Sequence, residues 1–432
     1  MRITFLSTND NLGGAATVTL RLIDGLRQLG EDAVMVCARH TLADAGYVRP
    51  VGRMRWLSAF LRERLSIYLR NGLSRKRLFR VSTASAGCRV YDHPTVKSAD
   101  VIVLNWINQG LVSLSDIDRL CSLGKPVVWI MHDLWCATGI CHLPGGCDRF
   151  TGACGCCPLL GHAGGHGHAE DISHRVWQRK RDLYARHPNL VFVAVSRWQH
   201  EVCRRSSLMH GRLIHLLPHA FPVEEYSTRP TSEQQMALQE LGINTDARLI
   251  VMAAARLDDP VKDLPMAVEA LNRLAASSPD LARGCQAVFV GELRNRSILD
   301  ELEVNHTTTG LLPQERLRAL YSASTVVIST SDYETMGATL MEGIASGATA
   351  VTFGNGGQRD IVTHGVNGYI ARYKDADDFA DCLQKALTAP FDRAAQHSDM
   401  AGRFSAATIA SRFLDIIKGA ATPSGRIWGR VL

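Results

Sequence analysis

Residues 325–347 read TVVISTSDYETMGATLMEGIASG, and this stretch gives the strongest indication of the fold. The apolar run Thr325–Thr330 predicts a short buried strand, and Ala338–Ser346 predicts a helix. Glu334 follows the predicted strand in a loop, whereas Glu342 lies within the predicted helix. Two carboxylates are therefore expected near one strand end, beside a helix N-terminus whose N–H groups can bind phosphate. A carboxylate is also a good acceptor for the hydroxyls of a sugar.

The alternation of short apolar runs and longer amphipathic segments continues along the rest of the chain. Further strands are predicted at Ile3–Ser7, Ala33–Ala38, Val101–Asn105, Val127–His132, Leu190–Val195, Leu249–Ala254, Ala287–Gly291 and Thr349–Phe353. Further helices are predicted at Thr17–Leu29, Leu114–Leu123, Pro265–Ala275 and Ala376–Leu387. This rhythm is typical of α/β proteins whose parallel sheets are covered by helices on both faces.

The length of the chain and one interruption of the pattern predict its domains. A chain of 432 residues is too long for one ordinary core, and Pro218–Pro230 is rich in proline and polar residues. We expect an N-terminal domain over residues 1–218, a linker over 219–230, a C-terminal domain over 231–402, and a C-terminal helix and tail over 403–432 that packs back on the N-terminal domain. Both domains are expected to be doubly wound and Rossmann-like, with ligands at the carboxyl ends of the strands in a central cleft.

Composition and the first residues narrow the class of protein. The net charge of +6 is small for this length, so no nucleic acid partner is expected. No apolar run is long enough to cross a bilayer, and Met1–Leu6 lacks the separate regions of a signal peptide. We therefore expect a cytoplasmic protein whose 12 cysteines are reduced and form no disulfide framework.

Two groups of residues in the first half stand beside predicted strand ends. Gly13 and Gly14 open the first predicted helix, where glycine lets the backbone approach a phosphate; a tight turn between strand and helix is the alternative. His132 ends the strand Val127–His132, at the edge where open α/β sheets place ligand groups. A histidine that caps or packs is the alternative interpretation of that position.

Two cations follow a strand in the second half. Arg256 and Lys262 come directly after Leu249–Ala254. Arginine offers a planar fork of donors and lysine a mobile point charge, a combination that suits a diphosphate. The alternative is a solvated loop in which both cations form surface ion pairs with the neighbouring aspartates, Asp258, Asp259 and Asp263.

Taken together, these motifs resemble the family-4 retaining glycosyltransferases of the GT-B fold. The stretch Ser329–Gly347 resembles the Glu-x7-Glu signature of that family. Gly356–Asp360 and Gly365–Gly368 resemble its downstream loop. The remaining motifs occur in the order of the family, namely Gly13-Gly14, His132, Ser196, the pair of Arg256 and Lys262, and Gly310–Tyr321.

The resemblance implies a role for each donor-site residue. Glu342 is expected to hold the nucleotide ribose and Glu334 to contact the donor sugar. Arg256 and Lys262 are expected to bind the donor diphosphate and to stabilise its charge as it leaves. The backbone near Gly337 is expected to cradle the phosphates.

The resemblance also implies roles for residues in the first half of the chain, and it implies the type of reaction. Gly13 and Gly14 are expected to help hold the phosphates, and His132 to lie beside the reacting sugar. The resemblance implies transfer of a hexose with retention, from a nucleoside diphosphate sugar to a lipid-linked or growing polysaccharide acceptor, without a catalytic metal. Where the family commonly has Pro-Asn-Gly, this sequence has Pro218-His219-Ala220.

A cysteine-rich segment follows His132, within an expected insertion over residues 136–168. Cys154 and Cys157 have the spacing of a zinc knuckle, and Cys141 and Cys147 form a more loosely spaced pair. We expect these four to bind a structural zinc; Cys136 or His142 could replace one of them, and a loop of reduced thiols is the alternative. The segment resembles an insertion in a subgroup that makes extracellular polysaccharide, such as colanic-acid-type transferases. Residues 161–168 are rich in glycine and histidine.

Residues 53–80 are strongly basic, with apolar side chains at near-helical spacing. A basic amphipathic helix can lie on an anionic membrane surface, here the inner face of the cytoplasmic membrane, which suits a lipid-linked acceptor. The alternative is a helix packed on the sheet with a solvated arginine face. Two other functions remain open for the whole chain: a sugar-nucleotide epimerase of the same fold, and a catalytically silent carbohydrate-binding protein.

Overall fold

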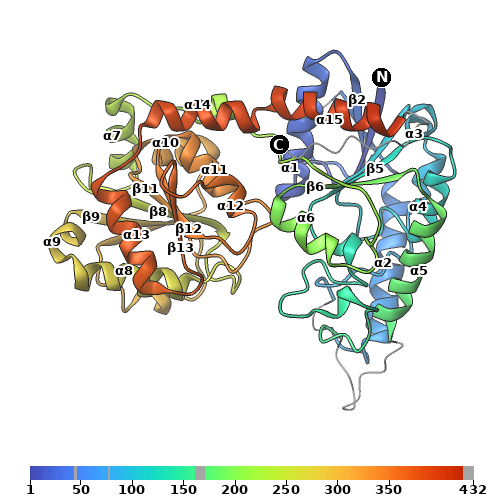
Figure 1. Cartoon of the computed structure of the whole chain (residues 1–432), viewed down its shortest axis with the longest axis horizontal. Helices are drawn as coiled ribbons and strands as arrows, with labels where there is room; N and C mark the ends of the chain where they lie inside the picture. Colours follow the sequence, from blue (N-terminus) through green and yellow to red (C-terminus); the bar gives the residue numbers. More distant parts are fainter. Residues whose placement is uncertain (43–45, 76–77, 161–170, 422–432) are drawn as a thin grey trace. The chain divides into compact units, whose positions relative to one another are not determined.

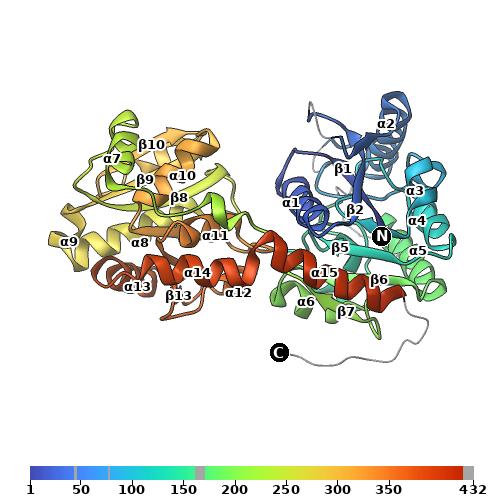
Figure 2. The ribbon, with the colours of Figure 1, turned by 90° about the horizontal axis from the view of Figure 1, so that it is seen from above.

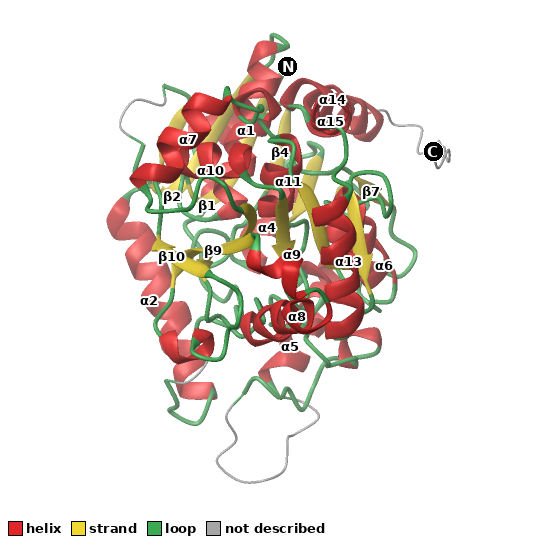
Figure 3. Ribbon diagram, turned by 90° about the vertical axis from the view of Figure 1, so that its left-hand side faces the viewer, coloured by secondary structure: helices red, strands yellow, loops and turns green. Residues whose placement is uncertain are grey.

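The computed structural model describes residues 1–42, 46–75, 78–160 and 171–421, and it divides into two compact units (Figure 1). Unit 1 comprises Met1–Ala220 and Ala406–Leu432, and unit 2 comprises Phe221–Ser405. Each unit is built around its own parallel sheet, whose strands are the yellow arrows of Figure 3.

Unit 1 contains a seven-stranded sheet in the order β3-β2-β1-β4-β5-β6-β7. Its strands are β1 (Arg2–Asn9), β2 (Asp32–Arg39), β3 (Val48–Pro50), β4 (Val101–Leu104), β5 (Val127–Met131), β6 (Leu190–Ala194) and β7 (Ile214–Leu216). Successive side chains of a strand point to opposite faces, so Ile3 and Phe5 join one apolar cluster and Leu6 the other. Both faces of the sheet are thus buried.

The helices of unit 1 cover both faces of this sheet. They are α1 (Gly14–Gln28), α2 (Arg53–Arg70), α3 (Pro94–Ser98), α4 (Leu114–Cys121), α5 (Ile172–Arg186), α6 (Arg197–Arg204) and α15 (Ala406–Ala421). Helix α15 runs beside α1 (Figure 2). The contact requires Gly25, because a Cβ atom there would lie 2.7 Å from the carbonyl oxygen of Ala406.

Unit 2 contains a six-stranded sheet in the order β10-β9-β8-β11-β12-β13. Its strands are β8 (Arg248–Arg256), β9 (Cys285–Glu292), β10 (His306–Gly310), β11 (Val326–Ser329), β12 (Thr349–Phe353) and β13 (Gly368–Ala371). Its helices are α7 (Thr231–Glu240), α8 (Leu264–Ser277), α9 (Pro279–Arg283), α10 (Gln314–Ala323), α11 (Ala338–Ala345), α12 (Gln358–Ile361), α13 (Ala376–Thr388) and α14 (Arg393–Phe404). Two apolar clusters again pack on the two faces.

The architecture confirms the predicted α/β class with two parallel, helix-covered sheets. The sequence pattern missed the outer strands β3, β7, β10 and β13, since these are short or polar and carry little periodicity. The unit boundary falls between Ala220 and Phe221, inside the expected linker 219–230. Most of that segment is part of unit 2, where Phe221, Val223 and Tyr226 are buried.

The expected C-terminal segment 403–432 is divided between the two units after residue 405. Residues 403–405 belong to unit 2, and α15 packs in unit 1. Residues 422–432, and residues 161–168 of the expected insertion, lie outside the described residues. Within the described ranges, no helix combines the length and the apolar content needed to cross a membrane.

Candidate functional site

Unit 2 brings its predicted site residues to one edge of its sheet. Arg256 ends β8, Lys262 lies in the loop from β8 to α8, and Glu334 lies in the loop from β11 to α11. Strands β8 and β11 are neighbours, and the strand order reverses between them. Such a switch point opens a crevice at the carboxyl ends of parallel strands, where α/β sheets bind ligands.

Lys262 and Glu334 contact each other directly. The ammonium group of Lys262 forms an ion pair with Oε1 of Glu334, which also accepts a hydrogen bond from Oγ of Ser331 at 3.0 Å. Oγ1 of Thr330 donates to the carbonyl oxygen of Lys262 at 2.9 Å, so the two loops are also joined through the backbone. The side chains of Lys262 and Glu334 are 29% and 24% exposed, which leaves both accessible to a ligand.

Two glycines hold the loop of Glu334 in place. The N–H of Gly357 donates to the carbonyl oxygen of Glu334 at 2.7 Å. A Cβ atom on Gly357 would lie 2.1 Å from the carbonyl oxygen of Thr335, and one on Gly356 would lie 2.8 Å from the backbone of Glu334. Because no side chain fits at either position, the glycines let one loop pack directly on the other.

Glu342 lies in α11, and a tyrosine positions its carboxylate. The hydroxyl of Tyr226 donates to Oε1 of Glu342 at 3.2 Å, and it accepts a hydrogen bond from Nε2 of Gln314. Burial, together with the charge of Glu342, raises the pKa of Tyr321 well above its usual value, so that hydroxyl also stays protonated. Tyr226 lies in the segment expected to be a linker, and for that reason the sequence did not indicate its role.

The N-terminus of α11 provides backbone N–H groups beside these carboxylates. Gly337 caps the helix with a φ of 102°, and no side chain caps the helix end. No acidic residue lies in the first turn of α11. The free N–H groups and the helix dipole therefore favour an anion at this end.

Arg256 is more exposed than Lys262 and has different partners. Its side chain is 41% exposed and lies 3.4 Å from a carboxylate oxygen of Asp258 and of Asp259. The alternative of surface ion pairs therefore describes Arg256 in this structure, but not Lys262. Asp263, the third aspartate, is paired with Lys374.

Gly13 and Gly14 of unit 1 also follow a strand at a switch point, because the strand order reverses between β1 and β4. Gly13 caps α1 with a φ of 89° and no side-chain hydrogen bond. A Cβ atom on Gly13 or Gly14 would meet nothing within 4 Å, so the turn is open above the helix N-terminus. Glycine is favoured at position 13 because of the positive φ, and not because neighbouring atoms leave no space for a side chain.

His132 directly follows β5 and contacts two further polar residues. Its Nε2 lies 3.1 Å from Oδ1 of Asn105, which also accepts a hydrogen bond from Oγ1 of Thr19. Its ring stacks on His219, with 5.4 Å between the ring centroids. Burial lowers the pKa of His132 to about 4 and the pKa of His219 well below its usual value. Both imidazoles are therefore neutral near pH 7.

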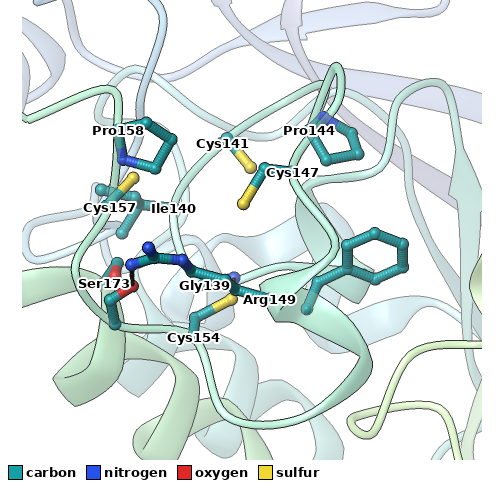
Figure 4. Close-up of a pocket in the computed structure, with 12 residues that line it drawn as sticks. Gly139, Ile140, Cys141, Pro144, Cys147, Arg149, Cys154, Cys157, Pro158 and Ser173 are labelled. Carbon is teal, nitrogen blue, oxygen red and sulfur yellow. Dashed lines mark hydrogen bonds between the residues drawn. The ribbon is translucent and has the colours of Figure 1, made fainter. Parts of the chain in front are cut away.

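Asp133 joins this strand end to the cysteine-rich segment. Its Oδ2 accepts a hydrogen bond from Nε1 of Trp106 at 2.9 Å and lies 2.6 Å from Nδ1 of His142. The carbonyl oxygen of His142 in turn accepts the N–H of Leu134 at 2.8 Å. The four predicted zinc ligands, Cys141, Cys147, Cys154 and Cys157, line one small cavity beside this network (Figure 4).

Sequence reasoning missed Asn105, Tyr226 and the contact between His132 and His219. Only the replacement of Pro-Asn-Gly by Pro218-His219-Ala220 marked the position of His219. Nothing in the sequence marked Asn105 or Tyr226, because both act through contacts that are distant along the chain.

Residues 234–403 match the family described as Glycosyl transferases group 1. The match covers most of unit 2. The D-inositol 3-phosphate glycosyltransferase of Stackebrandtia nassauensis is 31% identical to this chain over 163 residues, which are 35% of this chain and 36% of that relative. The chain therefore matches only about a third of the length of that curated relative.

Solved structures with a similar fold extend the comparison beyond the group 1 region to both units. Anabaena HepE in complex with UDP has a TM-score of 0.62 and 17% identity, covering 97% of this chain and 100% of HepE. WaaG, a glycosyltransferase involved in lipopolysaccharide biosynthesis, has a TM-score of 0.57 and 16% identity, covering 96% of this chain and 100% of WaaG. The chain has the GT-B fold, as its sequence predicts.

The neutral state of His132 predicts a loss of stability in acid. Its pKa of about 4 lies below the unfolded value of about 6.5, so the stabilisation is complete above about pH 6.5 and is lost as the pH falls toward 4. Between about pH 7 and pH 5 the wild type should lose on the order of 2 kcal/mol more unfolding free energy than His132→Asn. Urea unfolding at both pH values measures this difference.

The exposed histidine His210 provides the control, because His210→Asn should keep the acid sensitivity of the wild type. Equal acid sensitivity in wild type and His132→Asn would show that His132 is not held neutral in the folded protein.

Proposed function

We propose that the chain is a retaining glycosyltransferase that moves a hexose from a nucleoside diphosphate sugar to a lipid-linked or growing polysaccharide acceptor. The observation that carries the proposal is the contact between Lys262 and Glu334 at the switch point of the group 1 region. A cation for the leaving diphosphate and a carboxylate for sugar hydroxyls lie side by side there. HepE, which has the same fold, binds UDP, and this supports a nucleotide donor.

The charges of the site suit departure of a diphosphate. Glu334 holds Lys262 in place before the donor binds, and the carboxylate then turns to sugar hydroxyls while the ammonium turns to the phosphates. The N-terminus of α11 adds backbone N–H groups, and Arg256 exchanges its exposed aspartate partners for the diphosphate. Fixed positive charge lowers the free energy of the negative charge that develops on the leaving group. We therefore expect no catalytic metal.

The carboxylate of Glu342 suits the two hydroxyls of a ribose. Tyr226 donates to Oε1, which keeps the carboxylate oriented. In unit 1, neutral His132 offers a hydrogen-bonding group that adds no charge, as contact with a reacting sugar requires. Gly13 and Gly14 leave the N-terminus of α1 open for phosphate oxygens.

The exposed face of helix α2 supports the proposal that the acceptor is carried in a membrane. One face of α2 packs in unit 1 through Ala59, Glu63, Arg64 and Ile67, as the alternative of a packed helix requires. The outer face exposes Leu61, Leu65 and Leu69 at 55%, 56% and 58%, among exposed arginines. Lys76 and Arg77, counted in the basic segment 53–80, lie outside the described residues. An exposed leucine stripe with flanking arginines fits the surface of an anionic bilayer.

We propose that the protein acts at the cytoplasmic face of a membrane. WaaG has a role in lipopolysaccharide biosynthesis, which fits a cell-surface glycan as the product. The likeness of residues 136–168 to the colanic-acid-type subgroup stays a prediction.

Removal of either cation of the group 1 region should slow transfer. Arg256→Ala or Lys262→Ala should lower kcat by about 100-fold or more, because the leaving diphosphate loses a charge partner. Arg273→Ala, in an exposed pair on α8, is the matched control and should keep the wild-type rate. In a short assay, initial rates with EDTA should equal those without it. A strict requirement for Mg²⁺ would falsify the metal-independent mechanism.

Substitution of the two glutamates should have different effects, one on nucleotide affinity and the other on the rate of transfer. Glu342→Ala should raise the Kd for UDP or GDP by about tenfold or more, since a charge-assisted hydrogen bond to the ribose is lost. Tyr226→Phe should raise it less, because the carboxylate remains. Glu334→Ala should leave this Kd nearly unchanged and lower kcat. Calorimetric titration and initial rates measure the two effects; unchanged affinity in Glu342→Ala would contradict the ribose role.

The leucine stripe of α2 should control binding to vesicles. Replacement of Leu61, Leu65 and Leu69 by serine should weaken binding to vesicles of equal parts phosphatidylglycerol and phosphatidylcholine by about tenfold or more, as measured by cosedimentation. Leu213→Ser, at a residue 69% exposed elsewhere in unit 1, should bind like wild type. If the triple variant binds the vesicles as tightly as wild type does, the proposed contact of α2 with a membrane is wrong.

A further inference from the structure

Four cysteines from one irregular segment line a single small cavity. Cys141, Cys147, Cys154 and Cys157 line a cavity of about 20 Å³, and the view in Figure 4 shows their sulfur atoms around it. A space of this size holds one occupant about as large as a water molecule. The remaining walls are mainly apolar and include Ile140, Pro144, Phe150 and Pro158. Such walls offer a water few partners other than sulfur.

The segment has little structure of its own to hold it. Between β5 and α5, the described residues contain only the short turns Trp135–Ala137 and Arg149–Thr151 as helical structure. Each end of the cavity is nevertheless attached to the core of unit 1. Cys141 pairs with Val81 in an isolated β-bridge, and the N–H of Cys157 donates to Asp171 at 2.7 Å.

One hydrogen bond of the segment suits a thiolate in particular. The N–H of Gly139 donates to Sγ of Cys154 at 3.2 Å, a hydrogen bond that favours a negative sulfur. Gly139 is required for that contact, because a Cβ atom there would lie 2.5 Å from the carbonyl oxygen of Ser173. The segment therefore packs closely on the first turn of α5.

A buried lysine attaches the segment to α5. Lys180 is fully buried, and its Nζ donates to the carbonyl oxygens of Trp135, Thr138 and Gly139 at 2.5, 3.0 and 3.0 Å. Three backbone carbonyls of the segment are therefore held by one side chain of the helix.

We propose that Cys141, Cys147, Cys154 and Cys157 bind one zinc ion as four thiolates. Each thiol loses its proton to solvent as its sulfur binds, and no oxidation takes place. Zinc–sulfur bonds of about 2.3 Å place the sulfurs of a tetrahedral site about 3.8 Å apart. In the described chain no three of these sulfurs all lie within 4.8 Å of one another, so the ion draws them inward.

One group of possible metal ligands in the described chain is already close together, but it does not suit a metal. Asp10, Cys37 and His40 lie within 4.8 Å of one another. The carboxylate of Asp10 already accepts hydrogen bonds from Thr41 and Leu42 and contacts His40 at 2.8 Å. Its oxygens are thus occupied by the protein itself.

The zinc site has a structural role beside the end of β5. Cys141 is adjacent to His142, whose ring lies 2.6 Å from the carboxylate of Asp133. Binding of zinc therefore fixes the residues that hold the loop after His132. This inference does not depend on glycosyl transfer, because the ion takes no part in the reaction.

The first test measures metal in untagged wild-type protein by elemental analysis. About one zinc per chain is expected. Each of the four Cys→Ser variants should lose most of that zinc. Cys156→Ser is the matched control, since Cys156 lies in the same segment and does not line the cavity; it should keep the metal. Loss of zinc in Cys156→Ser equal to that in Cys154→Ser would overturn the assignment of ligands.

A second test uses only the wild-type chain, because a serine variant can fail to fold. Removal of zinc with a chelator under reducing conditions should make four thiols reactive to alkylation, and added zinc should protect the same four, identified by mass spectrometry. Cobalt(II) added to the metal-free protein should give the absorption of a tetrahedral thiolate site. Protein without zinc whose four thiols react equally with and without the ion, or a disulfide between any two of them, would overturn the proposal.

Discussion

Parallel pairing of every strand is the constraint on which both units depend. Each pair of neighbouring strands in the two sheets is parallel, so every β–α loop leaves its sheet at the carboxyl edge. The N-termini of the following helices lie at that edge too, and their N–H groups attract anions. Arg256 and Glu334 are 78 positions apart in the sequence. Both nevertheless lie at the carboxyl edge of the same sheet.

Close backbone packing makes that edge a specific site in unit 2. Gly356 and Gly357 lie against the loop of Glu334 with no space for a side chain. The loop is also joined to Lys262 by an ion pair, and Thr330 joins it to the backbone of the β8–α8 loop. A charge held by several contacts needs little reorganisation when a ligand replaces one of them, which is the condition for electrostatic stabilisation of a leaving group.

The candidate histidine of unit 1 is held as a neutral ring by burial, whereas the candidate side chains of unit 2 are charged. His132 and His219 stack as neutral rings. Asn105 contacts the ring of His132, and the same oxygen of Asn105 accepts a hydrogen bond from Thr19. The Cys-rich segment lies next to this strand end and is attached to α5 through the buried ammonium of Lys180. A segment without strands needs such cross-links, because it buries too little apolar surface to fix its own conformation.

The sequence by itself determined the α/β class, the central strands and the helix of Glu342, because long apolar runs and helical periodicity are local properties. It also located Glu334, Lys262 and His132 at strand ends. The edge strands β3 and β10 were not predictable, since three residues or a run of threonines carry no periodic signal. Only the tertiary structure decided that Tyr226 orients Glu342, that His219 stacks on His132, and that four cysteines share one cavity. Those contacts join residues far apart in the chain or in an irregular loop, and they form only when the packed sheet brings them together.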